Sequence, residues 1–157
     1  MDVEIIAVGK TTSKSVGMLV EEYASRLPHY IPFKITYLPD LKNKRGLSEQ
    51  RQKEMEGEAI LDKTAPSDFL VLLDERGKEY TSVQFSEFMQ KQMSAGRKRL
   101  LFVIGGPYGF SDAVYSRADS KLSLSKMTFN HEMVRAFAVE QVYRAMTILR
   151  GEPYHHD

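Results

Sequence analysis

Short apolar runs alternate along the chain with longer segments in which apolar residues recur at helical spacing. The apolar runs have the length of strands and predict them at residues 3–8, 33–38, 69–73, 100–104 and 121–124. Helical spacing predicts helices at residues 15–27, 48–63, 82–93 and 131–149, with a short helix after Ser111-Asp112. Because strands alternate with helices and most strands are apolar throughout, the sequence predicts an α/β fold: a mostly parallel sheet flanked by helices on both faces.

Composition narrows the class of protein. The 157 residues are 42% hydrophobic and 27% charged, which is typical of one globular domain, expected to span residues 1–157. The chain has no cysteine, and no apolar run approaches the roughly 20 residues that cross a bilayer. Residues 2–9 form a strand pattern where a signal peptide would stand. We therefore expect a cytoplasmic protein without a membrane contact, and the net charge of +1 gives no strong nucleic-acid signal.

A glycine-rich segment follows one of the apolar runs. Residues 100–110 read LLFVIGGPYGF, so Gly105 and Gly106 come directly after a predicted buried strand. Ligands of open α/β sheets bind where strands end, and glycine allows a close approach to the backbone. A tight turn between strand and helix explains the same residues equally well. The segment matches neither a dinucleotide-binding fingerprint nor a phosphate-binding loop, which argues against a nucleotide-dependent enzyme.

A second segment, residues 122–129, reads LSLSKMTF and places hydroxyl side chains between two apolar stretches. Its backbone groups and its hydroxyls are suited to binding the polar edge of a small ligand. The alternative is helix capping, in which Thr128 or Asn130 accepts hydrogen bonds from the first backbone N–H groups of the last helix.

The last predicted helix is apolar around most of its circumference, which indicates burial on more than one side. A partner subunit is the simplest second surface in so small a chain. Arg135 projects into this apolar band, so its guanidinium is expected to meet a carboxylate, backbone carbonyls or an anionic ligand. Glu140 and Arg144 lie four residues apart, a spacing that also suits an ordinary surface ion pair.

The chain ends on Gly151-Glu152-Pro153-Tyr154-His155-His156-Asp157. A frayed terminus is the usual outcome for such a segment, whereas tyrosine and histidine together suit base stacking and proton transfer. His155 and His156 are adjacent, and His131 is the only other histidine nearby in the sequence, so we expect no metal site.

Several of these segments together resemble the RlmH family. They are VEIIAVGK near the start, LLDERGK in the centre, FVIGGPYGF, and the long SLSKMTFNHEMVRAFAVEQVYRAMTILRGEPYHH. The resemblance runs from end to end. It implies a SPOUT-type S-adenosylmethionine-dependent RNA methyltransferase, a homodimer with a C-terminal trefoil knot. The implied target is N3 of pseudouridine 1915 in helix 69 of 23S rRNA, within assembled ribosomes.

The resemblance also implies site residues. The pocket for S-adenosyl-L-methionine falls on Leu73, Gly105, Leu124, Ser125, Lys126, Met127, Thr128 and Phe129. Tyr154 and His155 match the closing Tyr-His tail of the family. We expect His155 to act as the base and Tyr154 to stack on the target base. Arg135 and Arg144 are expected to contact RNA phosphate or the developing oxyanion, across the dimer. His156 and Asp157 depart from the basic end expected after His155. The alternative is a non-catalytic ribosome- or RNA-binding protein of the same fold.

Overall fold

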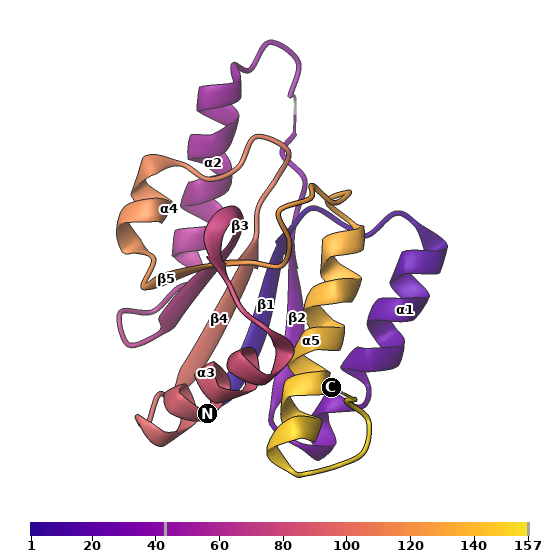
Figure 1. Cartoon of the computed structure of the whole chain (residues 1–157). Helices are drawn as coiled ribbons and strands as arrows, with labels where there is room; N and C mark the ends of the chain where they lie inside the picture. The colour runs from indigo at the N-terminus through magenta and orange to yellow at the C-terminus, as the bar shows by residue number, and fades with distance from the viewer. Residues whose placement is uncertain (43, 157) are drawn as a thin grey trace.

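The computed structural model describes residues 1–42 and 44–156 and has the predicted α/β architecture (Figure 1). The strands are β1 (Asp2–Val8), β2 (Phe33–Leu38), β3 (Phe69–Glu79), β4 (Arg99–Ile104) and β5 (Ser120–Ser123). The helices are α1 (Lys14–Ala24), the 3₁₀ turn η1 (Leu27–His29), α2 (Glu49–Asp62), α3 (Ser82–Ser94), α4 (Asp112–Arg117) and α5 (Met133–Leu149). The first helix ends earlier than predicted: a separate turn that contains Pro28 follows it, because proline cannot donate the next backbone hydrogen bond.

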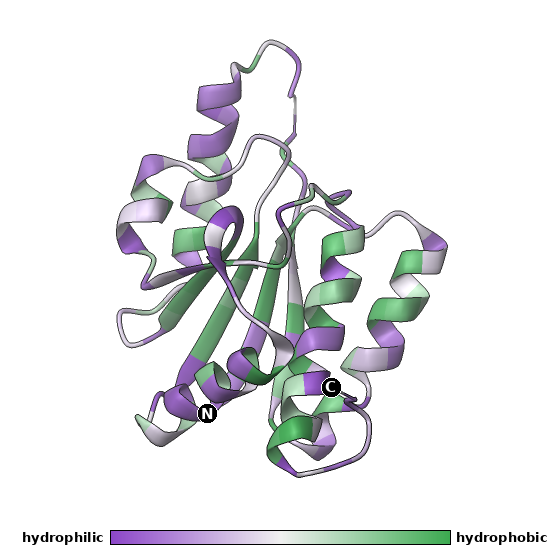
Figure 2. Cartoon of the chain, viewed as in Figure 1, coloured by the Kyte–Doolittle hydropathy of each residue, from purple (hydrophilic) through white to green (hydrophobic). Residues whose placement is uncertain are grey.

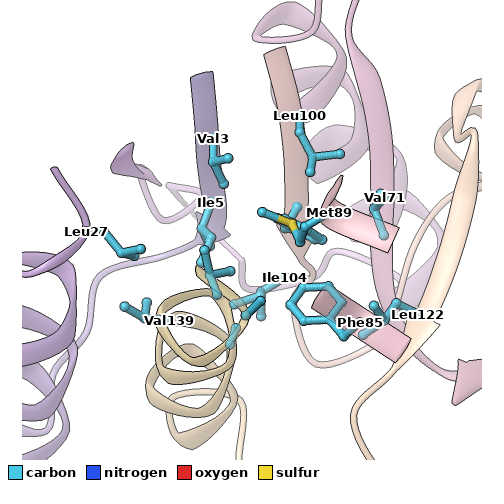
Figure 3. Packing of buried hydrophobic residues seen from close by; sticks show 14 of the residues in the cluster. Val3, Ile5, Leu27, Val71, Phe85, Met89, Leu100, Ile104, Leu122 and Val139 are labelled. Carbon is cyan, nitrogen blue, oxygen red and sulfur yellow. The ribbon is translucent and has the colours of Figure 1, made fainter. Parts of the chain in front are cut away.

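The described strands form one parallel sheet in the order β2-β1-β4-β3-β5, which confirms the predicted sheet. Successive side chains of a strand point to opposite faces, so each face has its own core. Ile5 faces a core shared with α1, α3 and α5, whereas Ile6 faces a core shared with α2 and α4. Figure 3 shows the first of these cores, where Ile5, Phe85 and Val139 from three different elements converge.

Hydropathy follows this layering. Figure 2 shows hydrophobic strands in the centre and a largely hydrophilic α2 on one face. The helices α1, α2, α3 and α4 begin at side chains that cap them. For example, Ser48 Oγ accepts from Arg51 N at 3.0 Å, and Thr81 forms a reciprocal capping box with Gln84. No helix formed by the described residues has both the length and the apolar composition for a membrane span.

β3 is longer than the sequence predicts. Its apolar run ends at Leu73 and predicts a turn at residues 74–77, but β3 continues to Glu79 with an irregularity between Leu73 and Lys78. Both parts of β3 pair with β5, so this polar segment is extended by its hydrogen bonds to a neighbour and not by an apolar pattern of its own. At Gly77 the two backbones nearly touch, since a Cβ there would lie 2.7 Å from Leu122 N.

α5 lies between α1 and α3 on one face of the sheet. Its buried residues include Ala136, Val139, Val142 and Met146. The chain therefore covers most of this helix itself, and the apolar character of α5 does not require a partner subunit. Phe137 is an exception, because 41% of it is exposed.

Candidate functional site

The candidate site lies where β3, β4 and β5 meet the loops that follow them. Register places Leu73 between Ile104 on one side and Leu122 on the other, so three apolar side chains from neighbouring strands line up. The glycine segment leaves the sheet after Ile104, and the hydroxyl-rich loop leaves it after Ser123. Together they enclose a cavity of about 590 Å³. Parallel α/β sheets bind ligands at this kind of edge.

The structure brings together nearly all residues predicted to bind the cofactor. Those that line the cavity are Leu73, Gly105, Leu124, Ser125, Met127, Thr128 and Phe129. Lys126 is the exception: its side chain is 87% exposed and its Nζ lies 3.8 Å from Glu79 Oε1. Segments that are distant in the sequence thus converge on one cavity.

The glycine segment forms a tight turn and a cavity wall at once. Gly109 N donates to the Gly106 carbonyl oxygen at 3.2 Å, and Gly109 has a φ of +83°, in the left-handed region that favours glycine. A Cβ on Gly105 would lie 2.9 Å from the Phe110 ring. The two interpretations of this segment are therefore compatible, because the turn places its backbone against the cavity.

Hydroxyl groups hold the second loop in shape. Ser123 Oγ donates to the Ser125 carbonyl oxygen at 2.9 Å, and Ser125 Oγ accepts from Met127 N at 2.9 Å. Thr128 Oγ1 donates to Glu75 Oε2 at 2.9 Å, which joins this loop to the opposite wall of the cavity. The capping alternative is wrong for both residues, because no side chain of the described residues caps the N-terminus of α5. Asn130 Oδ1 accepts from Glu132 N at 2.9 Å, one residue before the helix, and Thr128 bonds to Glu75.

Sequence reasoning missed the polar residues of β3 that line the cavity, Asp74, Glu75 and Arg76. Asp74 accepts hydrogen bonds from Tyr115 Oη and, at 2.9 Å, from Arg76 N. Burial opposes ionisation of Asp74, but these hydrogen bonds outweigh it and lower the pKa of its carboxyl. A usable signal was present, because these charged residues directly follow an apolar strand, where sheet ligands bind.

Three of the predicted catalytic residues form a separate cluster with Glu140. Arg144 Nη2 donates to Glu140 Oε1 at 2.6 Å, and Tyr154 Oη donates to the same oxygen at 2.8 Å. The Arg144 guanidinium lies over the Tyr154 ring, 4.8 Å from its centroid. The pair Glu140–Arg144 is thus more than a surface ion pair, since it anchors the C-terminal tail. Tyr154 and His155 of the tail contact α5, through Tyr143 and Arg144 respectively. Asp157 lies outside the described residues.

Hydrogen bonds determine where the protons of His155 and Tyr154 lie in this cluster. Arg144 Nη1 lies 3.1 Å from His155 Nδ1. Because a guanidinium has donors only, Nδ1 is the acceptor, and the ring proton of a neutral His155 sits on Nε2. Burial, then the hydrogen bonds with Tyr23 and Glu140, raise the pKa of Tyr154, so its phenol stays protonated at neutral pH.

Arg135 lies apart from the cluster of Arg144, Tyr154 and His155. It is buried, with 2% exposure, and donates from Nη2 to the Val8 carbonyl oxygen at 2.8 Å and from Nη1 to Thr11 Oγ1 at 2.8 Å. Of the three expected partners of this guanidinium, a carboxylate, a backbone carbonyl or an anionic ligand, the structure shows a backbone carbonyl. Its predicted contact with RNA stays a prediction. None of Arg135, Arg144, Tyr154 and His155 lines the cavity in the described part of the chain.

A smaller cavity of about 330 Å³ lies behind the first, between α3 and α5. Leu73, Leu122, Leu124 and Phe129 border both cavities. The Phe129 ring packs on Phe137, with centroids 4.9 Å apart. Within residues 1–42 and 44–156, no group of acidic, histidine or cysteine side chains is arranged to hold a metal ion.

Known proteins with similar sequences match this chain from end to end. The family model described as "Predicted SPOUT methyltransferase" matches residues 1–155. A protein of Christiangramia forsetii is 57% identical over 99% of both chains, and one of Parabacteroides distasonis is 56% identical over the whole of both. A protein of Flavobacterium johnsoniae is 56% identical over 99% of both chains. Each of the three is named ribosomal RNA large subunit methyltransferase H.

Proposed function

The chain belongs to the SPOUT methyltransferase family, and on this premise we propose that it methylates large-subunit ribosomal RNA with S-adenosyl-L-methionine as the donor. The proposed target is N3 of a pseudouridine in helix 69 of 23S rRNA. The observation that carries the proposal is the cavity at the ends of β3, β4 and β5, where seven of the eight predicted cofactor-binding residues meet.

The residues of this cavity fit such a cofactor. Its volume of about 590 Å³ lies within the range of small-molecule sites, about 300–1,000 Å³. Leu73, Leu122 and Leu124 offer apolar surface to the faces of an adenine ring, and the adjacent loops offer backbone groups to its polar edge. Asp74 and Glu75 add carboxylates to the wall, which suits a ligand that carries positive charge.

When bound, S-adenosyl-L-methionine supplies an electrophilic methyl group on a sulfonium sulfur. The chain must hold this group in line with the acceptor nitrogen and exclude water, and placing two reactants together contributes about 7–11 kcal/mol at best. The bond between Thr128 and Glu75 closes one side of the cavity, and the turn at Gly105-Gly106 closes another. Both are properties of the folded chain before any ligand arrives.

The acceptor nitrogen belongs to an imide and loses a proton during the reaction. In our proposal Arg144 stabilises the negative charge that develops on the imide oxygens, because its guanidinium is always protonated and Glu140 orients it. Tyr154 offers an aromatic face for stacking on the target base. His155 accepts the proton only after its Nδ1 separates from Arg144, because its Nε2 already carries the ring proton while that hydrogen bond is in place.

We further propose a homodimer in the cytoplasm, with the trefoil knot of the family. In one chain the cluster of Arg144, Tyr154 and His155 does not border the cavity, so a second copy is needed to complete an active site. The close crossing of Gly77 over β5 is consistent with a chain that threads near this point. One active site would then combine the cavity of one protomer with the tail of its partner.

Mass spectrometry of 23S rRNA tests the function. Cells that lack this protein should have lost one methyl group from the helix 69 pseudouridine, and the wild-type gene should restore it. The Gly105→Leu variant, whose side chain would collide with the Phe110 ring in the cavity wall, should fail to restore it. An unchanged methylation pattern in the deletion strain contradicts the proposal.

The second candidate is a non-catalytic protein that binds the ribosome through the same fold. Calorimetry separates the two, because a methyltransferase binds S-adenosyl-L-methionine and a pure binding module does not. Binding to the wild-type protein, lost in Gly105→Leu, supports the enzyme. No heat of binding at millimolar cofactor favours the alternative.

A further inference from the structure

A buried acid lies directly behind the glycine segment of the cavity. Glu56 of α2 is 5% exposed, and its carboxyl faces Gly106: a Cβ on Gly106 would lie 2.7 Å from both carboxyl oxygens and 3.0 Å from the carboxyl carbon. Glu56 itself is not part of the cavity wall among the described residues. It therefore touches the back of a segment whose front forms the cofactor site.

The neighbouring residue of α2 makes a second contact with the same segment. A Cβ on Gly57 would collide with Ser111 Oγ and lie 3.1 Å from Val114 Cγ2. Ser111 ends the glycine segment and caps α4, since its Oγ accepts from Val114 N at 3.4 Å. One turn of α2 thus packs against both ends of the segment 106–111. The Glu56 carboxyl contacts Gly106, and the backbone of Gly57 contacts Ser111.

The hydrogen bonding of Glu56 does not explain its burial. Its Oε2 accepts one weak bond from Gln52 Nε2 at 3.3 Å, while its Oε1 is buried without a hydrogen-bond partner in the described part of the chain. Burial raises the pKa of this carboxyl, an effect that Gln52 and the positive charge of Lys44 offset in part and that Asp40 reinforces. Burying a carboxyl costs free energy, and its hydrogen bonds do not compensate for that cost here.

We propose that Glu56 is a positioning residue for the cofactor site: its carboxyl is the support against which the Gly105–Phe110 turn rests. Removing the carboxyl leaves a void beneath Gly106, into which the turn relaxes away from the ligand. Adding a side chain at Gly106 pushes the turn away from Glu56 and towards the ligand. The inference rests on the proposed function, because the ligand used to test it is S-adenosyl-L-methionine.

The contact predicts that two damaging substitutions compensate each other. Glu56→Ala and Gly106→Ala should each weaken cofactor binding about 10-fold, whereas the double variant should recover to within about 3-fold of wild type, because contacting residues couple. The methyl group that Gly106→Ala adds then occupies space that the Glu56 carboxyl has left. Glu56→Gln, which keeps the shape, should stay within about 2-fold of wild type. The KM for ribosomal substrate should not change in any of these variants.

Calorimetric titration with S-adenosyl-L-methionine and thermal melting measure these effects on the full chain. Asp68→Asn is the matched control, because Asp68 is a buried acid that pairs with Arg99 at the opposite end of the sheet. It should lower the melting temperature without weakening cofactor binding. If Asp68→Asn and Glu56→Ala weaken binding alike, or if the double variant is weaker than both single ones, the positioning role is wrong.

The controls separate this inference from the function itself. If wild-type protein binds the cofactor and Glu56→Ala binds it equally well, the inference fails and the proposed function stands. If wild-type protein does not bind it, the proposed function fails. Should Glu56→Ala not fold, Gly106→Ala alone and Glu56→Gln still decide, since the first must weaken binding and the second must not.

Discussion

The Glu132 carboxylate at the start of α5 holds Thr12, 120 residues earlier in the chain, with both of its oxygens. Oε1 accepts from Thr12 N at 2.7 Å and Oε2 accepts from Thr12 Oγ1 at 2.6 Å. Oε1 also accepts from Ser13 N at 2.8 Å, at the N-cap of α1. One side chain therefore joins the beginnings of the two helices that pack side by side on the sheet.

This junction predicts a pH-dependent contribution to stability. The hydrogen bonds from Thr12 and Ser13 lower the pKa of Glu132 from 4.5 to about 2. Its stabilising effect is therefore complete above pH 4.5 and lost as the pH falls towards 2. Glu132→Gln should be less stable than wild type at pH 7, and the difference should shrink below pH 4.5, measured by urea unfolding. Glu58→Gln, on exposed surface, is the control; a gap that does not narrow in acid contradicts the assignment.

The contact between Gly77 and β5 predicts that even a methyl group there is harmful. A Cβ would lie 2.7 Å from Leu122 N and from Lys121 C, and backbone atoms cannot move aside as a side chain does. Gly77→Ala should lose about 2 kcal/mol of stability, as overpacking typically does. Gly17→Ala in α1 is the matched control, because its nearest neighbour is 3.9 Å away and alanine favours helices. Equal melting temperatures for the two variants would contradict the close backbone contact between Gly77 and β5.

The hydrogen bond from Thr128 to Glu75 predicts a selective effect on the cofactor. Thr128→Val keeps the shape of the side chain and removes the donor that ties two walls of the cavity together. The Kd for S-adenosyl-L-methionine should rise about 5-fold, the worth of one ordinary hydrogen bond. Thr64→Val, whose hydroxyl bonds to Ile60 O on α2, serves as the control and should leave the Kd unchanged. Equal affinities for both variants would show that this bond does not shape the site.

The separation of the tail cluster from the cavity predicts complementation between defective chains. Gly105→Leu damages the cavity, and Arg144→Ala damages the tail cluster of Arg144, Tyr154 and His155. If the chain forms the proposed homodimer, the homodimer of either variant should be inactive. A mixed dimer, purified with two different tags, contains one site in which both parts are intact. It should regain about half of wild-type activity, following the symmetry of a two-site dimer. An inactive mixed dimer would mean that each chain builds its own site, and a monomer in solution would exclude the shared site altogether.

The positions of the strands and helices followed from local sequence. Apart from the end of β3, apolar runs and helical periodicity predicted the elements to within a few residues. The helices predicted from residue 48 and after Ser111-Asp112 begin at Ser48 and Ser111, which cap them. The glycine segment and the hydroxyl-rich loop were identified for the same reason: glycine and serine interrupt apolar patterns where the chain leaves a sheet. Such features depend on neighbours in sequence, and sequence contains them directly.

Other features of the structure depend on contacts between residues far apart in the chain, and only the tertiary structure revealed them. The extension of β3 through Asp74 to Glu79 depends on pairing with β5 and has no pattern of its own, so the sequence suggested a turn there. The burial of α5 between α1 and α3, the carbonyl partner of Arg135, and the position of Glu56 behind Gly106 are likewise contacts between residues far apart in the chain. Local propensity carries no information about such pairs, because their energy arises only when the folded backbone brings them together.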